Sequence, residues 1–184
     1  MADLNESTLT KLSTEGMSQQ CSHCPLPANI SKHGTAAETF TDAYYACLQN
    51  AHHAIGTYYA PKETLPDGKV VPGLQWNGNT IEDAAAFQKM FENEMPFTHF
   101  EVQSLDCHVL NPTIPTTSKE SRDVEKSFSM LVVVSGYVRL EEPKNGPMKG
   151  FTDTLILTPN KDKGSKKGPR RDWMIQNQNF RYVV

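Results

Sequence analysis

The stretch Ser127-Phe-Ser-Met-Leu-Val-Val-Val-Ser-Gly-Tyr-Val-Arg-Leu-Glu141 gives the strongest β-strand signal in the chain. Its centre, Met130–Val134, is apolar at every position, whereas a strand with one solvated face alternates apolar and polar residues. We therefore expect both faces of this strand to be covered. If helices cover one face of the sheet, a second protein packed on the other face explains the pattern. The alternative is a central strand that carries a few stray apolar residues.

Three further segments have the periodicity of strands. Phe97–Leu110 alternates, but its apolar phase slips once near Gln103–Ser104, which predicts a β-bulge and a bent strand. Phe151–Thr158 and Asp172–Val184 follow the central strand along the chain. Together these segments predict an antiparallel meander in the C-terminal part.

Helical periodicity is confined to the first half of the chain. Apolar residues recur at helical spacing over Phe40–Ile55, and Thr35-Ala-Ala-Glu38 has the spacing of a capping box, so a first helix is expected to begin at Thr35. A second helix is expected after Thr80, its predicted cap, and before Pro96.

Between the two helices, Leu74–Trp76 is followed by Asn77-Gly78. This predicts a short strand entering a tight hairpin, because Asn-Gly tolerates the positive φ angles of a type I′ turn. With helices first and strands after them, residues 35–184 are expected to form a single α+β domain. Its N-terminal helices would pack on one face of a strongly bent antiparallel sheet.

Residues 1–34 are polar, aperiodic and rich in Ser, Thr and Gln, and we interpret them as a flexible leader. Cys21-x2-Cys24 is half of a zinc pattern, but a second Cys pair or a spaced His pair is missing, so no metal site and no cofactor are expected. Cys47 and Cys107 lie in apolar patterns, which is typical of buried thiols in a cytoplasmic or nuclear protein. Neither a signal pattern nor an apolar run of ~18 residues is present, so no membrane contact is expected.

The formal net charge is −3, so any contact with nucleic acid depends on a local patch. The segment 161–171 supplies one, with a single acid, Asp162, among its cations. Two interpretations stay open: a solvated hairpin loop, and a non-specific contact with RNA phosphates, since the segment has no aromatic residue on which bases stack. The six cations are Lys161, Lys163, Lys166, Lys167, Arg170 and Arg171.

Five segments also carry a family resemblance. They are Leu74-Gln-Trp-Asn-Gly-Asn79, Phe100-Glu-Val-Gln-Ser-Leu-Asp-Cys107, Leu131-Val-Val-Val-Ser-Gly-Tyr-Val138, Phe151-Thr-Asp-Thr-Leu-Ile-Leu157 and Asn179-Phe-Arg-Tyr182. These segments resemble the nuclear transport factor 2-like family. They are most similar to its export-type branch, the small subunits of TAP-type heterodimeric messenger-RNA export receptors. The Trp-Asn-Gly-Asn and Leu-Asp-Cys pieces are specific to that branch, and the resemblance spans about Phe40 to Tyr182.

The resemblance implies a cone-shaped, non-catalytic domain that pairs, sheet against sheet, with a related domain of a large export receptor subunit. It implies a protein of the nucleus and nuclear pore that shuttles to the cytoplasm and reaches pore proteins through its partner. It also implies that Asp106 is the interface aspartate that meets an arginine of the partner. Alternation after the bulge points Asp106 to the face opposite Leu105 and Cys107. The predicted partner interface comprises Asp106, Met130, Val132, Val134, Leu155, Leu157, Phe180 and Tyr182.

One alternative is the import branch of the same family, a homodimer that carries the small GTPase Ran. That function requires an open apolar pocket rimmed by acidic side chains. The acidic pair Glu141-Glu142 lies in a predicted turn, and large residues are available to fill the cone. The residues expected to fill it are Phe87, Phe91, Trp173 and Met174.

The other alternative is a small enzyme of the isomerase or dehydratase type, since relatives with this cone shape place a carboxylate or His inside it for proton transfer. No pair of titratable residues here has a spacing that such chemistry requires. A buried carboxylate of strongly raised pKa in an open pocket would favour catalysis. The candidates are Asp153, His99 and His108 on predicted strands, with Tyr44 and His53 on the first helix.

Overall fold

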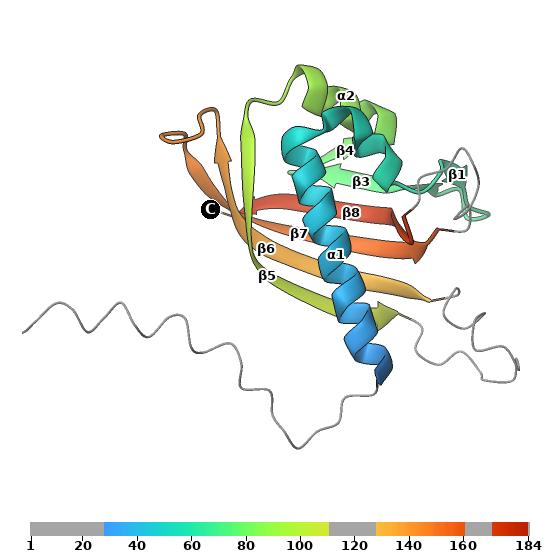
Figure 1. Ribbon diagram of the computed structural model, residues 1–184. Coiled ribbons are helices and arrows are strands. Elements are labelled where there is room, and N and C mark those ends of the chain that lie inside the picture. Colours follow the sequence, from blue (N-terminus) through green and yellow to red (C-terminus); the bar gives the residue numbers. More distant parts are fainter. Residues whose placement is uncertain (1–27, 111–127, 161–170, 184) are drawn as a thin grey trace, which may run out of the picture.

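The computed structural model describes residues 28–110, 128–160 and 171–183 (Figure 1). Two α-helices and a 3-10 helix accompany a large sheet and a small one in this part of the chain. The helices are α1 (Ala28–Asn50), η2 (His52–Tyr58) and α2 (Ala84–Asn93). The strands are β1 (Glu63–Thr64), β2 (Val70–Val71), β3 (Gly73–Trp76), β4 (Asn79–Ile81), β5 (Thr98–Leu110), β6 (Ser129–Leu140), β7 (Met148–Pro159) and β8 (Trp173–Val183).

Both predicted helix starts are wrong. Helix α1 begins at Ala28, so Thr35 lies inside the helix and the capping box does not mark its start. Helix α2 is capped by Asp83, whose side chain accepts a hydrogen bond of 2.8 Å from the backbone N–H of Ala86. Thr80 instead lies in β4, where it pairs with Gln75. No helix in the described ranges is long and apolar enough to cross a membrane.

The large sheet has the strand order β4-β3-β8-β7-β6-β5. The antiparallel meander of β5 to β8 is confirmed, and so is the bulge in β5, where the register with β6 shifts between Val102 and Ser104. The predicted Asn-Gly turn is also confirmed, with φ angles of 48° at Asn77 and 88° at Gly78. Strand β3 pairs parallel with β8, so the sheet is mixed rather than wholly antiparallel.

Helix α1 crosses one face of the sheet, which we call the inner face (Figure 1). Tyr44, Tyr45 and Leu48 of α1 are buried there together with alternate residues of the central strands. In β6, burial alternates from Met130 to Val134, so that one set of side chains is fully buried and the other is half-buried. The core therefore lies between α1 and the inner face.

Aromatic side chains fill the cone between η2, α2 and the sheet. The ring of Trp76 stacks on that of Phe180, with centroids 3.8 Å apart, and both Phe87 and Phe91 pack against Trp76. The expected filling by Phe87 and Phe91 is confirmed, since each is 1% exposed. Trp173 is only half-buried and packs against Phe128 instead.

Candidate partner-binding face

The face of the sheet opposite α1, which we call the outer face, is defined by cross-strand register. Residues directly opposite each other in paired strands point to the same side of a sheet. Asp106 of β5 lies opposite Val133 of β6, which lies opposite Thr154 of β7. The row continues through Asn179 of β8 to Gln75 of β3. The next row contains His108, Leu131, Ile156, Asn177 and Gly73.

An apolar centre occupies the outer face. Leu131, Val133 and Ile156 come from neighbouring strands and are half-buried by their own neighbours alone. Thr154 lies beside them on β7, opposite Val133. Within the described ranges, the helices that contact the large sheet do so from the inner face or from its β4 and β8 end. The outer face therefore carries a small apolar centre, bordered by polar side chains, without a covering layer in the described part of the chain.

Asp106 and His108 form a polar border of this face. They are two residues apart on β5, and the Nε2 atom of His108 lies 3.1 Å from Oδ2 of Asp106. Their side chains are 70% and 67% exposed. The expectation that Asp106 points away from Leu105 and Cys107 is confirmed, because those two residues lie opposite Val134 and Val132 of the inner face. Asp106 is therefore exposed on the outer face, and its contact with a partner's cation stays a prediction.

Most of the residues predicted to contact a partner lie in this chain's own core. A residue without exposed surface offers no area to a second protein while the fold is intact. Tyr182 is half-buried at the inner rim, where its ring contacts Phe180 and the ammonium of Lys149. The prediction placed these residues on the wrong face. The fully buried ones, each 0% exposed, are Met130, Val132, Val134, Leu155, Leu157 and Phe180.

The residues missed by sequence reasoning are Leu131, Val133, Ile156 and His108. Asp106, whose face was predicted correctly, identifies them only once the register between β5 and β6 is known. Because side chains alternate between faces, the strand position opposite Asp106 identifies the outer set in β6, and the register shows that it is Val133 and not Val132.

Arg171, one of the six predicted RNA-contact cations, makes contacts within the folded domain. Its guanidinium lies over the ring of Tyr58, 3.5 Å from the centroid, and its Nη1 atom donates a hydrogen bond of 2.7 Å to Oγ1 of Thr57. These contacts tie the start of the final segment to η2. The other five cations of the predicted RNA-contact loop lie outside the described residues: Lys161, Lys163, Lys166, Lys167 and Arg170.

A polar network crosses the core between α1 and the inner face. Tyr45 donates a hydrogen bond of 3.0 Å to Oδ2 of Asp153, and Nε2 of Gln178 donates one of 2.8 Å to the same atom. The amide oxygen of Gln178 accepts from Tyr44 and Tyr59, whose hydroxyls are 2.7 Å apart. Asp153 is 0% exposed, and its Oδ1 atom has no hydrogen-bond partner among the described residues. Burial raises the pKa of Asp153 to about 7 and the pKa of the Tyr44, Tyr45 and Tyr59 hydroxyls well above the usual value.

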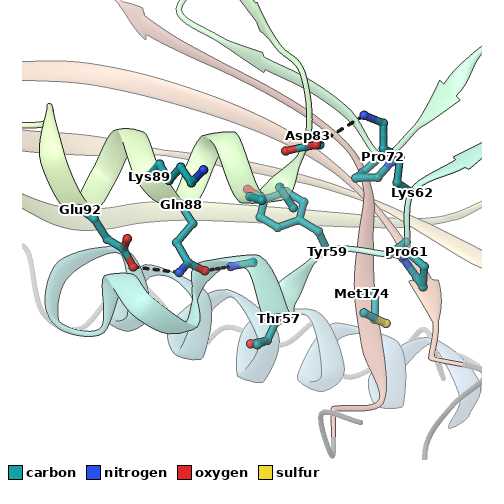
Figure 2. Close-up of a pocket in the computed structure, with 14 residues that line it drawn as sticks. Thr57, Tyr59, Pro61, Lys62, Pro72, Asp83, Gln88, Lys89, Glu92 and Met174 are labelled. Atoms are coloured by element: carbon teal, nitrogen blue, oxygen red, sulfur yellow. Dashed lines mark hydrogen bonds and ion pairs between the residues drawn. The ribbon is translucent and has the colours of Figure 1, made fainter. Parts of the chain in front are cut away.

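A groove of about 540 Å³ opens beside this network, between η2, α2 and β8 (Figure 2). Tyr59 and Met174 line it, and ion pairs and hydrogen bonds border it. Lys62 lies 3.4 Å from Asp83, and the side-chain amide of Gln88 donates a bond of 2.8 Å to Glu92. The hydroxyl of Tyr59 is turned inward to Gln178, and Asp153 is not among the lining residues.

The arrangement does not meet the condition for catalysis stated above. The carboxylate of raised pKa is sealed in the core rather than placed in an open pocket. The histidines among the candidates do not join it, since His53 and His99 are exposed and His108 pairs with Asp106 on the outer face.

Comparison with known proteins identifies the family. The family model of the nuclear transport factor 2 (NTF2) domain matches residues 36–182. The chain belongs to the NTF2 family. It is 26% identical over 147 residues to NTF2-related export protein 2 of Mus musculus, which covers 80% of this chain and 84% of the mouse protein.

Solved structures share the NTF2 fold of this chain. One is that of the Chaetomium thermophilum Mex67 NTF2-like domain complexed with Mtr2, with a TM-score of 0.63, 21% identity, and coverage of 82% of this chain and 98% of that one. Another is that of a Sac3N peptide bound to Mex67:Mtr2, with a TM-score of 0.62, 21% identity, and coverage of 82% and 99%. A structure of Mtr2 matches with a TM-score of 0.55, 18% identity, and coverage of 82% and 99%. The predicted α+β, NTF2-like fold class is confirmed.

Proposed function

We propose that this NTF2 domain is the small, non-catalytic subunit of a heterodimeric messenger-RNA export receptor, pairing through its outer face with the related NTF2-like domain of a large subunit. The observation that carries the proposal is the apolar centre of the outer face, Leu131, Val133 and Ile156, which has no covering layer in the described part. Apolar surfaces of this kind mark protein interfaces. Sheet-to-sheet contacts of the obligate class bury on the order of 2,000 Å² or more.

The names of the relatives support this choice of partner. The mouse relative is an NTF2-related export protein, and in one structural neighbour an NTF2-like domain of Mex67 is complexed with Mtr2. A partner with the same fold offers a second bent sheet whose apolar face would cover this one. The proposal also places the protein in the nucleus and at the nuclear pore, shuttling to the cytoplasm, with pore proteins reached through the large subunit.

Two features of the core support a non-catalytic subunit rather than an enzyme or a Ran carrier. The titratable network around Asp153 is closed to solvent. The cone that would have to stay open in a Ran carrier is filled by Trp76, Phe87, Phe91 and Phe180.

The proposal is tested by purifying the tagged chain from cells of its own organism and identifying what accompanies it. The expected result is one larger protein with an NTF2-like domain, present at a one-to-one ratio in native mass spectrometry. A stable homodimer that captures Ran would support the import alternative and contradict the proposal. A chain that stays monomeric at high concentration would contradict it as well.

Replacing Asp106 with Asn is expected to weaken the heterodimer without affecting the fold. Asp106 is exposed, so its substitution leaves the free chain's core intact. A hydrogen bond between charged groups is worth about 2 kcal/mol, so the Kd should rise by about thirtyfold. Binding is measured by titration of the purified subunits. Asp67→Asn, an exposed carboxylate in the loop between β1 and β2, is the matched control and should leave the Kd unchanged. Equal affinities of wild type and Asp106→Asn would remove Asp106 from the interface.

The proposed RNA contact rests on the basic segment 161–171. The salt dependence of RNA affinity tests it. If the five cations other than Arg171 neutralise phosphates of single-stranded RNA, they contribute up to about −3.5 to the slope of log affinity against log salt. Replacing them with Gln should flatten this slope in the assembled heterodimer and leave subunit binding intact. Arg171 is kept because its contacts with Tyr58 and Thr57 stabilise the fold. An unchanged slope would identify the segment as a solvated loop. The five are Lys161, Lys163, Lys166, Lys167 and Arg170.

A further inference from the structure

The outer face extends beyond its apolar centre to a second group of apolar residues. Side chains alternate along a strand, so the odd-numbered residues of β6 that follow Val133 stay on this face. Tyr137 is one of them. It lies opposite Gly150 of β7, which lies opposite Val183 of β8. Met148 belongs to the next row on the same face, where it lies opposite Arg139. We call Tyr137, Met148, Gly150 and Val183 the apolar corner.

The apolar corner is more exposed than the centre of the outer face. Tyr137, Met148 and Val183 are 47%, 53% and 54% exposed, whereas the three apolar side chains of the centre are half-buried. Exposed apolar side chains that gather on one face, rather than being scattered singly, mark an interaction surface. Tyr and Met are also among the residues enriched in the buried part of protein interfaces. One row of polar side chains separates the corner from the centre: Ser104, Ser135, Thr152 and Arg181.

The contacts within the chain give no reason for a glycine at position 150. A glycine inside a strand weakens the strand, and it marks a bulge, a tight bend or the close approach of another backbone. Gly136 of β6 is explained by the bulge, because a Cβ there would overlap the backbone oxygen of Glu101. A Cβ on Gly150 would have its nearest neighbours at 3.5 Å, an ordinary van der Waals contact, and Gly150 does not have a positive φ angle. The close approach of another chain accounts for this glycine.

The area of a stable interface also exceeds the apolar centre. An obligate interface of ~2,000 Å² takes about 1,000 Å² from each partner, which is the area of a disc of radius about 18 Å. Tyr137 is four residues from Val133 along β6, or about 13 Å. Val183 lies two strands further across the sheet, which places it about 16 Å from Val133. An interface of obligate size that is centred on Val133 therefore reaches both residues.

We propose that the large subunit covers the apolar corner as well as the centre, and that its backbone lies over Gly150 between the side chains of Tyr137 and Val183. This inference rests on the proposed heterodimer and adds a second apolar contact to it. Tyr137 is the main anchor of that contact, since a large aromatic side chain that is exposed in the free chain becomes buried in the complex. Arg181, in the polar row, becomes buried with it, so the large subunit presents a carboxylate to this guanidinium.

The test measures the Kd of the purified heterodimer for variants of the apolar corner. Tyr137→Ala should raise the Kd about thirtyfold, as expected for an anchor residue. Gly150→Val should raise it at least about tenfold, because the new side chain occupies the space of the partner's backbone. Both variants should keep the melting temperature of the free chain, since the changes lie on an exposed face and a Cβ at position 150 makes only ordinary contacts. Val70→Ala, at a 45% exposed position of the small sheet, is the control and should leave the Kd unchanged.

Hydroxyl-radical footprinting of the wild-type heterodimer gives a second readout that needs no substitution. Tyr137 and Met148 should be modified several-fold more slowly in the heterodimer than in the free chain, while Val70 should be modified at the same rate in both. Unchanged Kd values for Tyr137→Ala and Gly150→Val, or an unprotected Tyr137, would overturn this proposal. The heterodimer itself would then stand as long as Val133→Glu still abolishes pairing. A chain that forms no heterodimer would overturn both proposals.

Discussion

Replacing Val133 with Glu is expected to abolish pairing with the large subunit while the domain itself stays folded. Val133 lies at the centre of the outer face, opposite Asp106 on one side and Thr154 on the other. In the free chain a glutamate at this half-buried position keeps its carboxylate in water. In the heterodimer it would be buried among apolar side chains without a cation. The effective penalty for burying an unpaired charge is several kcal/mol. We expect a loss of about 5 kcal/mol, or more than a thousandfold in Kd.

The measurement is co-purification of the tagged variant with its partner, followed by titration of purified subunits. Val70→Glu is the matched control, because Val70 is 45% exposed in the small sheet of β1 and β2, away from the outer face. It carries the same change of charge and should bind normally. Val132→Glu gives the opposite contrast, because Val132 is 0% exposed and the variant should fail to fold. Normal partner binding by Val133→Glu would show that the outer face is not the interface.

The contrast between Val132 and Val133 shows where sequence reasoning reached its limit. The run Met130–Val134 revealed that β6 is apolar on both faces, but no polar residue within it marks which set faces the helices. That information lies in the register with β5, and register is a long-range property that a single sequence does not encode locally. Predicting Asp106 and Val132 on one face was wrong, because Asp106 lies opposite Val133.

Local backbone structure was predicted correctly where one short motif determines it. The Asn77-Gly78 turn requires positive φ angles that few other residue pairs tolerate, and the phase slip in β5 requires an extra residue. The parallel pairing of β3 with β8 was missed because it joins segments far apart in the sequence. The start of α2 was missed because Thr80 and Asp83 are both good caps, and only the pairing of Thr80 with Gln75 in the β-hairpin distinguishes them.

The burial of Asp153 also lacked a local signal. The sequence Thr152-Asp153-Thr154 is typical of a strand with a solvated face, yet Asp153 is fully buried opposite Val134. The donors that make this burial tolerable come from distant elements, Tyr45 on α1 and Gln178 on β8. A buried carboxylate held by two neutral donors has a measurable consequence for stability.

Stability of the wild-type chain is expected to fall as the pH rises from ~4 to 7 because of Asp153. Its folded-state pKa is raised to about 7 by burial, whereas an aspartate in the unfolded chain titrates near ~3.9. Below that pH both states carry the proton, so the contribution to stability is fully present. Above it the unfolded state loses the proton first, so stability declines and levels off above the folded pKa. A pKa difference of about 3 between the folded and unfolded states corresponds to about 4 kcal/mol, a large share of the stability of a small domain.

Asp153→Asn isolates this effect, because the amide does not titrate and its oxygen can still accept from Tyr45 and Gln178. The free energy of unfolding is measured by urea titration of wild type and variant between pH 4.5 and 8. We expect the stability of the variant relative to wild type to increase steadily as the pH rises, by about 3 kcal/mol over this range, since an ionised Asp153 costs the wild type stability only at higher pH. Asp83→Asn provides a control, because the hydrogen bond from the Ala86 N–H lowers the pKa of Asp83. Its contribution is fully present above the unfolded pKa of ~3.9 and is lost only as the pH falls below that value, so the difference in stability between this variant and wild type should stay constant between pH 4.5 and 8. A constant difference between Asp153→Asn and wild type across this range would mean that Asp153 does not change its protonation state on unfolding.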